Sequence, residues 1–143
     1  MPSGSRVDAF LRLSDECVAL FHTLRAAAEQ VHGQGELSAA RRGILRSLAN
    51  SGPQTVPQMA RARQVSRQHI QIVVNGLLED GLVRPVSNPA HKRSSLIQLT
   101  TPGRKKVEAM AAAERRLLAE LRLPSSAAMN QAAETLAAVR SII

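Results

Sequence analysis

Six polar side chains within residues 66–75 have the types and the spacing to bind a DNA duplex. Arginine can pair with guanine O6 and N7, and glutamine and asparagine can pair with adenine N6 and N7. The start of a helix also offers free backbone N–H groups to phosphate. The six residues are Ser66, Arg67, Gln68, His69, Gln71 and Asn75. Their chemistry predicts base contacts from Arg67, Gln68 and Gln71, with Ser66 and His69 near phosphate.

Basic side chains elsewhere in the chain could extend such a surface. Lys92 and Arg93 belong to a polar stretch over residues 87–94, and arginine in a narrow minor groove senses the shape of the DNA. Arg41 and Arg42 could add contacts to the phosphate backbone. The alternative for all of these residues is an ordinary solvated surface, on which single charges contribute little.

The distribution of charge favours the DNA-binding interpretation. The 143-residue chain has a formal net charge of +8. Residues 38–106 hold twelve basic and only two acidic residues, a net charge of +10, and the remainder of the chain is slightly acidic. Concentrated positive charge indicates a polyanionic partner rather than a particular fold. Because the chain has two Phe and no Trp or Tyr, it lacks the stacking platforms that single-strand binding requires.

No catalytic constellation is recognisable in the sequence. We find no glycine-rich phosphate loop and no nucleophile paired with a base. His22 and His32 lack a third metal ligand. Cys17 is the single cysteine, and Asp15 and Glu16 beside it disfavour a thiolate. The sequence therefore predicts a protein that is not an enzyme and has no cofactor or metal, in which Cys17 packs as a small apolar residue.

The apolar runs are too short for a membrane protein. None approaches the roughly 20 residues that span a bilayer, and the first six residues are mostly polar, unlike a signal peptide. A basic membrane-surface helix also fits poorly, because helix breaks interrupt the positive segment. These observations predict a cytoplasmic protein with no membrane partner.

Hydrophobic spacing and capping residues predict the elements that would position these side chains. Ser38, Thr55 and Ser66 are candidate N-caps, as is either Thr100 or Thr101. Short strands are expected over residues 82–86 and 95–99, joined by a hairpin loop over 87–94. Helices are expected over about 7–32, 39–50, 56–62, 67–80, 101–122 and 126–142, the first ended by residues 33–35.

This order of elements predicts a mainly α fold with a small β-hairpin wing. Residues 55–80 follow the plan of helix, short turn and capped helix. The resulting winged helix-turn-helix module would span residues 37–103. An N-terminal helix within residues 1–36 and C-terminal helices within 104–143 would flank it as dimerisation helices. The alternative is that these flanking helices close a core within one chain.

Three stretches of the chain resemble the MarR family of bacterial regulators. The first is Val-Ser-Arg-Gln-His-Ile at residues 65–70, continuing through Val74, Leu77 and the Gly-Leu-Val of residues 81–83. It is similar to the recognition helix of the family and its exit into the wing. Residues 88–94, Asn-Pro-Ala-His-Lys-Arg-Ser, resemble the Asp-Pro-x-Asp-x-Arg wing of the family. Residues 99–103, Leu-Thr-Thr-Pro-Gly, resemble its Leu-Thr-x-x-Gly entry into the long dimer helix.

The resemblance implies a homodimeric transcription regulator. Such a dimer would bind a pseudo-palindromic operator, with the recognition helix 66–80 in the major groove and the wing 87–94 at the minor groove. It implies a repressor that responds to a small hydrophobic or phenolic effector, although no residue here identifies one. The wing departs from the family pattern, because Asn88 and His91 stand at its usual acidic positions. In the family, the acid at the second of these positions helps to hold the wing arginine, and the sequence alone names no substitute that would hold Arg93.

A second hypothesis remains beside the regulator. The winged helix could be an interaction or architectural module that binds nucleic acid or acidic protein without preferring an operator. The affinity for one duplex sequence over a random duplex at fixed salt would distinguish the two.

Overall fold

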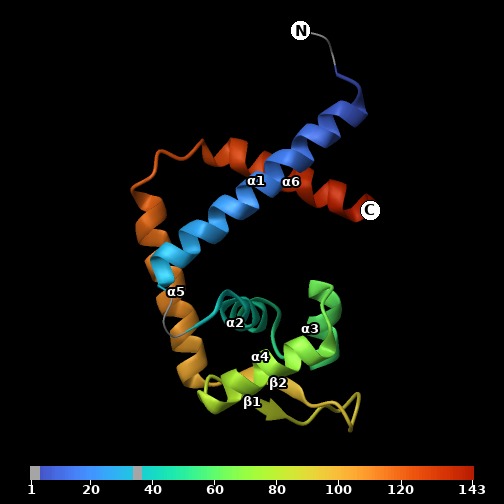
Figure 1. The fold of residues 1–143 in the computed structure, drawn as a ribbon, viewed down its shortest axis with the longest axis vertical. Helices are drawn as coiled ribbons and strands as arrows, with labels where there is room; N and C mark the ends of the chain where they lie inside the picture. The colour runs from blue at the N-terminus through green and yellow to red at the C-terminus, as the bar shows by residue number, and fades with distance from the viewer. Residues whose placement is uncertain (1–3, 34–36) are drawn as a thin grey trace.

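The computed structural model describes residues 4–33 and 37–143, and its elements follow the predicted order (Figure 1). The helices and strands are α1 (Arg6–His32), α2 (Ala39–Ser51), α3 (Val56–Arg63), α4 (Arg67–Glu79), β1 (Val83–Val86), β2 (Leu96–Leu99), α5 (Thr101–Ala119) and α6 (Ser126–Ile142). The mainly α fold with a hairpin wing is thereby confirmed. Helix α5 ends three residues earlier than expected, and of the residues expected to end α1, 34 and 35 lie outside the described ranges.

Short-range hydrogen bonds explain where most helices begin. The side chain of Ser38 accepts a hydrogen bond from the backbone of Arg41, and Thr55 forms a reciprocal capping box with Gln58. Ser66 caps α4 as predicted, because its side chain accepts a hydrogen bond from the backbone of His69. Of the two threonines proposed to cap α5, Thr100 does so. Each cap satisfies an N–H group that the first turn leaves without an intrahelical partner.

The hydrophobic core lies in the winged module. Helices α2, α3 and α4 pack with the hairpin, and Met110 of α5 joins them. Strands β1 and β2 are antiparallel, with Val83 opposite Leu99. Gln54 adds an isolated antiparallel bridge to Ile97, at backbone N···O distances of 3.2 and 2.7 Å. The bridge, which has no signature in the local sequence, ties the α2–α3 connection to the hairpin.

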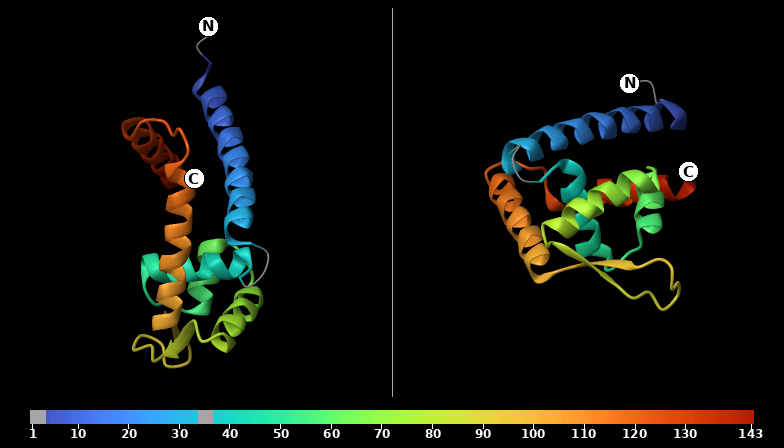
Figure 2. Two further views of the ribbon diagram at one scale, coloured as in Figure 1. Left: turned by 90° about the vertical axis from the view of Figure 1, so that its left-hand side faces the viewer. Right: turned by 60° about the horizontal axis from the view of Figure 1, so that its bottom comes forward.

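In the part of the chain that the structure describes, the flanking helices do not form a second core. Helices α1 and α6 lie on the side of the molecule away from the wing, and α5 leads from the module toward α6 (Figures 1 and 2). Neither α1 nor α6 buries a residue. The alternative that these helices close an intrachain core is therefore wrong. Among the described residues no helix is long and apolar enough to cross a membrane.

Ion pairs join the end of α1 to the module and to α5. Arg42 of α2 donates to Glu29 at 2.7 Å and to the carbonyl oxygen of Leu37 at 2.7 Å. The His32 ring nitrogen Nε2 lies 2.9 Å from a carboxylate oxygen of Glu114, which also pairs with Arg46. These contacts set the position of α1 relative to the winged module.

Candidate nucleic-acid interface

Helix α4 has one buried face and one polar face. Ile70, Val74 and Leu77 are buried in the core of the module, as their helical spacing predicted. The six polar residues named in the sequence analysis are all exposed. Packing of the apolar face therefore holds the helix while its polar face remains open to a partner.

A side-chain cap closes the first turn of α4. The hydroxyl oxygen of Ser66 accepts a hydrogen bond from the backbone N–H of His69 at 3.1 Å. Before it, Gln64 takes a left-handed conformation with φ of 54° and ends α3. The residues that connect α3 and α4 therefore place Arg67 at the first position of α4, where the helix dipole also favours anions.

Two amides on α4 pair with each other. The side-chain Nε2 of Gln71 donates to the side-chain oxygen of Asn75 at 2.8 Å, one turn later. Such a contact restricts both side chains before any ligand binds, while each amide keeps further donors and acceptors for a base edge.

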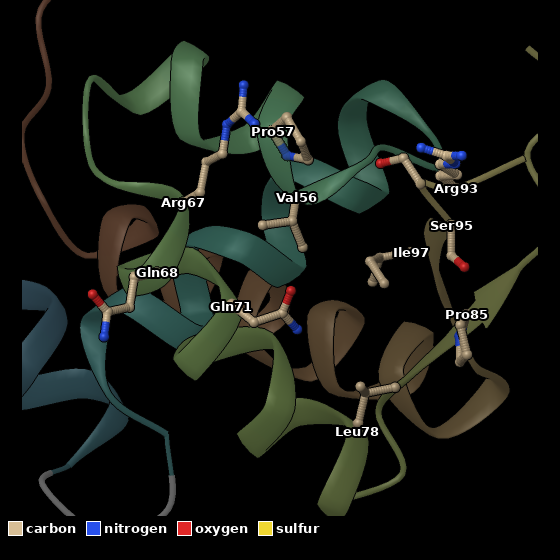
Figure 3. Close-up of a pocket in the computed structure, with 11 residues that line it drawn as sticks. Val56, Pro57, Arg67, Gln68, Gln71, Leu78, Pro85, Arg93, Ser95 and Ile97 are labelled. Carbon is tan, nitrogen blue, oxygen red and sulfur yellow. The ribbon is translucent and has the colours of Figure 1, made fainter. Parts of the chain in front are cut away.

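A groove of about 550 Å³ runs between α4 and the wing (Figure 3). Arg67, Gln68 and Gln71 lie along α4 on one side of it, and Arg93 lies with Ser95 on the other. The structure thus brings the three predicted base-contacting residues and one wing arginine, far apart in sequence, to a single concave surface. A groove with cationic walls and amide groups has the donors and acceptors that phosphates and base edges require.

The other predicted residues do not line this groove, Ser66, Arg41 and Arg42 among them. Lys92 lines a neighbouring hollow of the wing, beside Asn88 and Pro89. His69 lines a cavity of about 560 Å³ on another side of α4, together with Phe21 and Arg25 of α1. Asn75 is exposed and joined to Gln71 but is not among the groove residues.

Backbone and side-chain hydrogen bonds shape the wing. The side-chain oxygen of Asn88 accepts from the N–H of Ala90 at 3.1 Å, and the Asn88 carbonyl accepts from the N–H of His91 at 3.2 Å. The His91 carbonyl in turn accepts from the N–H of Ser94 at 3.2 Å. The turn itself therefore orients the segment that carries Arg93. Asn88, which stands at the first of the two wing positions where the MarR family usually has an acidic residue, forms part of that turn.

The prediction that Arg42 contacts DNA is wrong. Its side chain is buried, with 5% of the residue exposed, and is held by Glu29 and the Leu37 carbonyl. A signal was present in the sequence, because Arg42 lies three residues before Leu45 on the apolar stripe of α2. Arg41 is partly exposed and pairs with Asp80 at 2.8 Å.

The open face of α4 also carries an apolar residue that was not among the predicted contacts. Ile72 is 64% exposed and follows Gln71 directly. Its spacing of four residues from Gln68 places the two on one face of the helix. Helical periodicity alone predicts that Ile72 lies on this exposed face, but the predicted contacts included only polar side chains.

Cys17 is half-buried in a groove that Phe10, Leu136 and Val139 also line. Within the described ranges, no group of three His, Cys, Asp or Glu side chains could hold a metal ion.

Comparisons with known proteins agree with this geometry. A sequence model of the MarR family matches residues 36–94. The uncharacterized protein Rv2011c of Mycobacterium tuberculosis is 36% identical over 104 residues, which cover 68% of this chain and 73% of the relative.

Solved structures match nearly the whole chain. The MarR family transcription regulator SP03579 aligns with a TM-score of 0.75 at 26% identity, covering 95% of this chain and 91% of its own. Streptococcus pneumoniae FabT, solved in complex with DNA, aligns with a TM-score of 0.70 at 13% identity and coverages of 93% and 96%. Staphylococcus aureus MarR, solved with salicylate and kanamycin, aligns at 0.74 and 18% identity, with coverages of 96% and 97%.

These matches point to the same family as the helix-turn-helix, the hairpin wing and the flanking helices of the fold. Members of the matching family are transcription regulators and not enzymes. The chain belongs to the MarR family of winged helix-turn-helix, DNA-binding transcription regulators.

Proposed function

We propose that the protein is a homodimeric regulator that binds one operator sequence in preference to other DNA. The observation that carries this proposal is the groove that brings Arg67, Gln68 and Gln71 of α4 together with Arg93 of the wing. Helix α4 would enter the major groove, where Arg67 and the two glutamines contact base edges. Arg93 and Lys92 would contact the minor groove or its phosphates. FabT, a structural relative, was solved with DNA bound.

The flanking helices would form the dimer interface, one within residues 1–36 and two within 104–143. Within one chain α1 and α6 leave large apolar side chains exposed, including Phe21 on α1 and Leu136 on α6. Burial of such surface in a second copy would remove it from water. A two-fold dimer would place its two α4 helices on half-sites about 10 base pairs apart, in a pseudo-palindromic operator.

A small effector could control this dimer. The cavity between α1 and the winged module is lined by Phe21 and Arg25 and by Ile44, Val65 and Val73 of the module. Its apolar wall and its two arginines, Arg25 and Arg63, suit a small hydrophobic or phenolic molecule. An effector bound there would favour one spacing of the two α4 helices over another, and the dimer would release the operator. The protein would then act as a cytoplasmic repressor that the effector inactivates. Staphylococcus aureus MarR was solved with salicylate.

Fluorescence anisotropy over a salt series would test the proposal. The full-length protein would be titrated against the duplex upstream of its own gene and against a scrambled duplex of equal length. We expect the first duplex to bind more tightly by about 10³-fold or more at the same salt concentration.

Two other results would contradict operator specificity. Equal affinities that fall steeply with salt would leave a winged module that binds nucleic acid without sequence preference. If neither that duplex nor any duplex selected from a random pool binds, the positive face has a partner other than DNA.

A further inference from the structure

Ile72 is an unusual residue for the position that it occupies. It is 64% exposed, although isoleucine is among the residue types most often found inside proteins. Between residues 37 and 116, the only exposed large apolar side chains that the structure describes are Val65 and Ile72. The other large apolar residues of this segment are buried or half-buried.

The position of Ile72 on α4 places it among the residues proposed to contact bases. An α-helix turns by about 100° per residue. Gln68, Ile72 and Asn75 therefore form one stripe along the helix, and Gln71 lies beside it. The buried residues Ile70, Val74 and Leu77 occupy the opposite side. Ile72 is thus near the centre of the open face.

The flanking helices do not cover this face. Helix α4 packs mainly against α2, α3 and β1, and the α4 residues that line the cavity shared with α1 are His69, Ile70 and Val73, not Ile72. The dimer interface proposed for those helices therefore leaves Ile72 in contact with water in the absence of DNA. A partner that covers it must approach the same face as the partner of Gln68 and Gln71.

The major groove of DNA presents one apolar group to a recognition helix, and this is the C5 methyl group of thymine. We propose that Ile72 is a specificity-determining residue that contacts a thymine methyl group in each operator half-site. The inference rests on the proposed operator function and names one base that the operator must contain. The amides of Gln71 and Asn75 lie on the same side of α4, and such amides pair with adenine. An A·T-containing half-site would satisfy both groups.

The size of the effect follows from the burial of one methyl group. Removing a buried methyl group lowers affinity by about four-fold. A symmetric change in both half-sites of a dimer would then lower it by about fifteen-fold. Replacing thymine by deoxyuridine deletes only this methyl group and leaves the base pairing unchanged, so it isolates the contact.

The experiment begins with selection of a preferred duplex by the full-length protein from a random pool. Each thymine of the half-site is then replaced by deoxyuridine, symmetrically and one position at a time, and affinity is measured by anisotropy at fixed salt. We expect one position at which deoxyuridine weakens binding by about fifteen-fold. Ile72→Ala should bind the unmodified duplex more weakly and should no longer distinguish it from the deoxyuridine duplex at that position.

The matched control is Glu79→Ala, which shortens an exposed side chain at the end of the same helix. Glu79 is not among the residues that line the groove at the wing or the cavity next to α1, so this variant should keep the full deoxyuridine effect. Alanine has the highest helix propensity, and a thermal melt of Ile72→Ala should show a folded protein.

The outcomes separate this inference from the proposed function. A preferred duplex with no deoxyuridine-sensitive position, or a sensitivity that persists in Ile72→Ala, overturns the role of Ile72 alone. Failure to select any preferred sequence overturns the operator function, and the role of Ile72 falls with it.

Discussion

Gly103, in the first turn of α5, lies directly against the backbone carbonyl of Leu82, where a β-carbon at residue 103 would overlap the carbonyl oxygen. The same oxygen accepts a hydrogen bond from the N–H of Thr100 at 3.1 Å, and the Thr100 hydroxyl donates to the carbonyl of Gly81 at 2.6 Å. The end of the α4 segment, the entry to the wing and the start of α5 are therefore held together through backbone atoms. Any motion of α5 is coupled to the base of the wing.

This close approach predicts that Gly103→Ala is strongly destabilising. The added methyl group meets backbone, which cannot move aside without breaking the Thr100 bonds, so we expect a loss of about 3 kcal/mol or more in the free energy of unfolding. Gly76→Ala is the matched control, because there the methyl group meets the end of the flexible Arg41 side chain. Its cost should be offset by a gain of about 0.5–1 kcal/mol in helix propensity. Urea unfolding of both variants tests this, and equal stabilities would refute it.

Arg42 should contribute to stability rather than to DNA binding. Arg42→Ala removes a buried cation, leaves Glu29 without its partner and exposes the Leu37 carbonyl to an unfilled site. We expect a loss of about 2–3 kcal/mol in the free energy of unfolding. Water would replace part of the interaction that the Glu29 carboxylate loses with Arg42. Arg41→Ala, which breaks a more exposed pair, should cost less than about 1 kcal/mol. If Arg42→Ala instead left stability unchanged and reduced the salt dependence of DNA binding, its buried role would be wrong.

His32 should make the protein less stable at mildly acidic pH. Burial lowers the pKa of His32 below its usual 6.5, and the positive charges of Arg42 and Arg46 lower it further, against a smaller opposing effect of Glu29. The neutral ring can still donate from Nε2 to Glu114. Because the unfolded chain then binds the proton more readily, the free energy of unfolding falls as pH drops through 6.5, and the loss is complete below the pKa of the folded state.

The test compares unfolding at pH 7.5 and pH 5.5. His32→Gln keeps a donor for Glu114 but cannot titrate, so part of the stability lost at low pH should disappear in this variant. His22→Gln, on the exposed surface of α1, serves as the control and should keep the dependence of the wild-type protein. An identical pH dependence in all three proteins would exclude His32 as the source.

Arg67 should determine operator preference. Arg67→Ala is expected to reduce discrimination between operator and random duplex by about 1–3 kcal/mol, because alanine cannot form the bidentate pair with guanine. Arg67→Lys should retain most of the affinity for random DNA yet lose discrimination, since lysine keeps the charge without the planar fork. Anisotropy with both duplexes measures this. Equal weakening on the two duplexes in Arg67→Ala would identify Arg67 as a phosphate contact.

The wing should contribute mainly electrostatic affinity. Arg93→Ala is expected to weaken operator binding and to reduce the slope of log affinity against log salt by about 1 for each phosphate that the variant no longer neutralises. Lys92→Ala should act in the same direction. Anisotropy at four or more salt concentrations provides the slope. An unchanged slope in both variants would remove the wing from the interface.

The sequence by itself determined the order of the elements and the two faces of α4. Ser38, Thr55 and Ser66 were correctly placed as helix caps, and the spacing of Ile70, Val74 and Leu77 correctly predicted their burial. These features could be predicted because they depend on residues three or four positions apart, whose contacts follow from the geometry of the helix alone.

Tertiary structure decided which of these side chains meet. Only the folded chain shows that Arg93 shares a groove with Arg67, that His69 faces α1 instead, and that Glu29 holds Arg42 inside the protein. The bridge between Gln54 and Ile97 also joins residues far apart in sequence. Such contacts depend on how whole helices and strands pack, and similar local patterns are compatible with many packings. A basic residue therefore has the same local signature whether it faces solvent, DNA or a buried carboxylate.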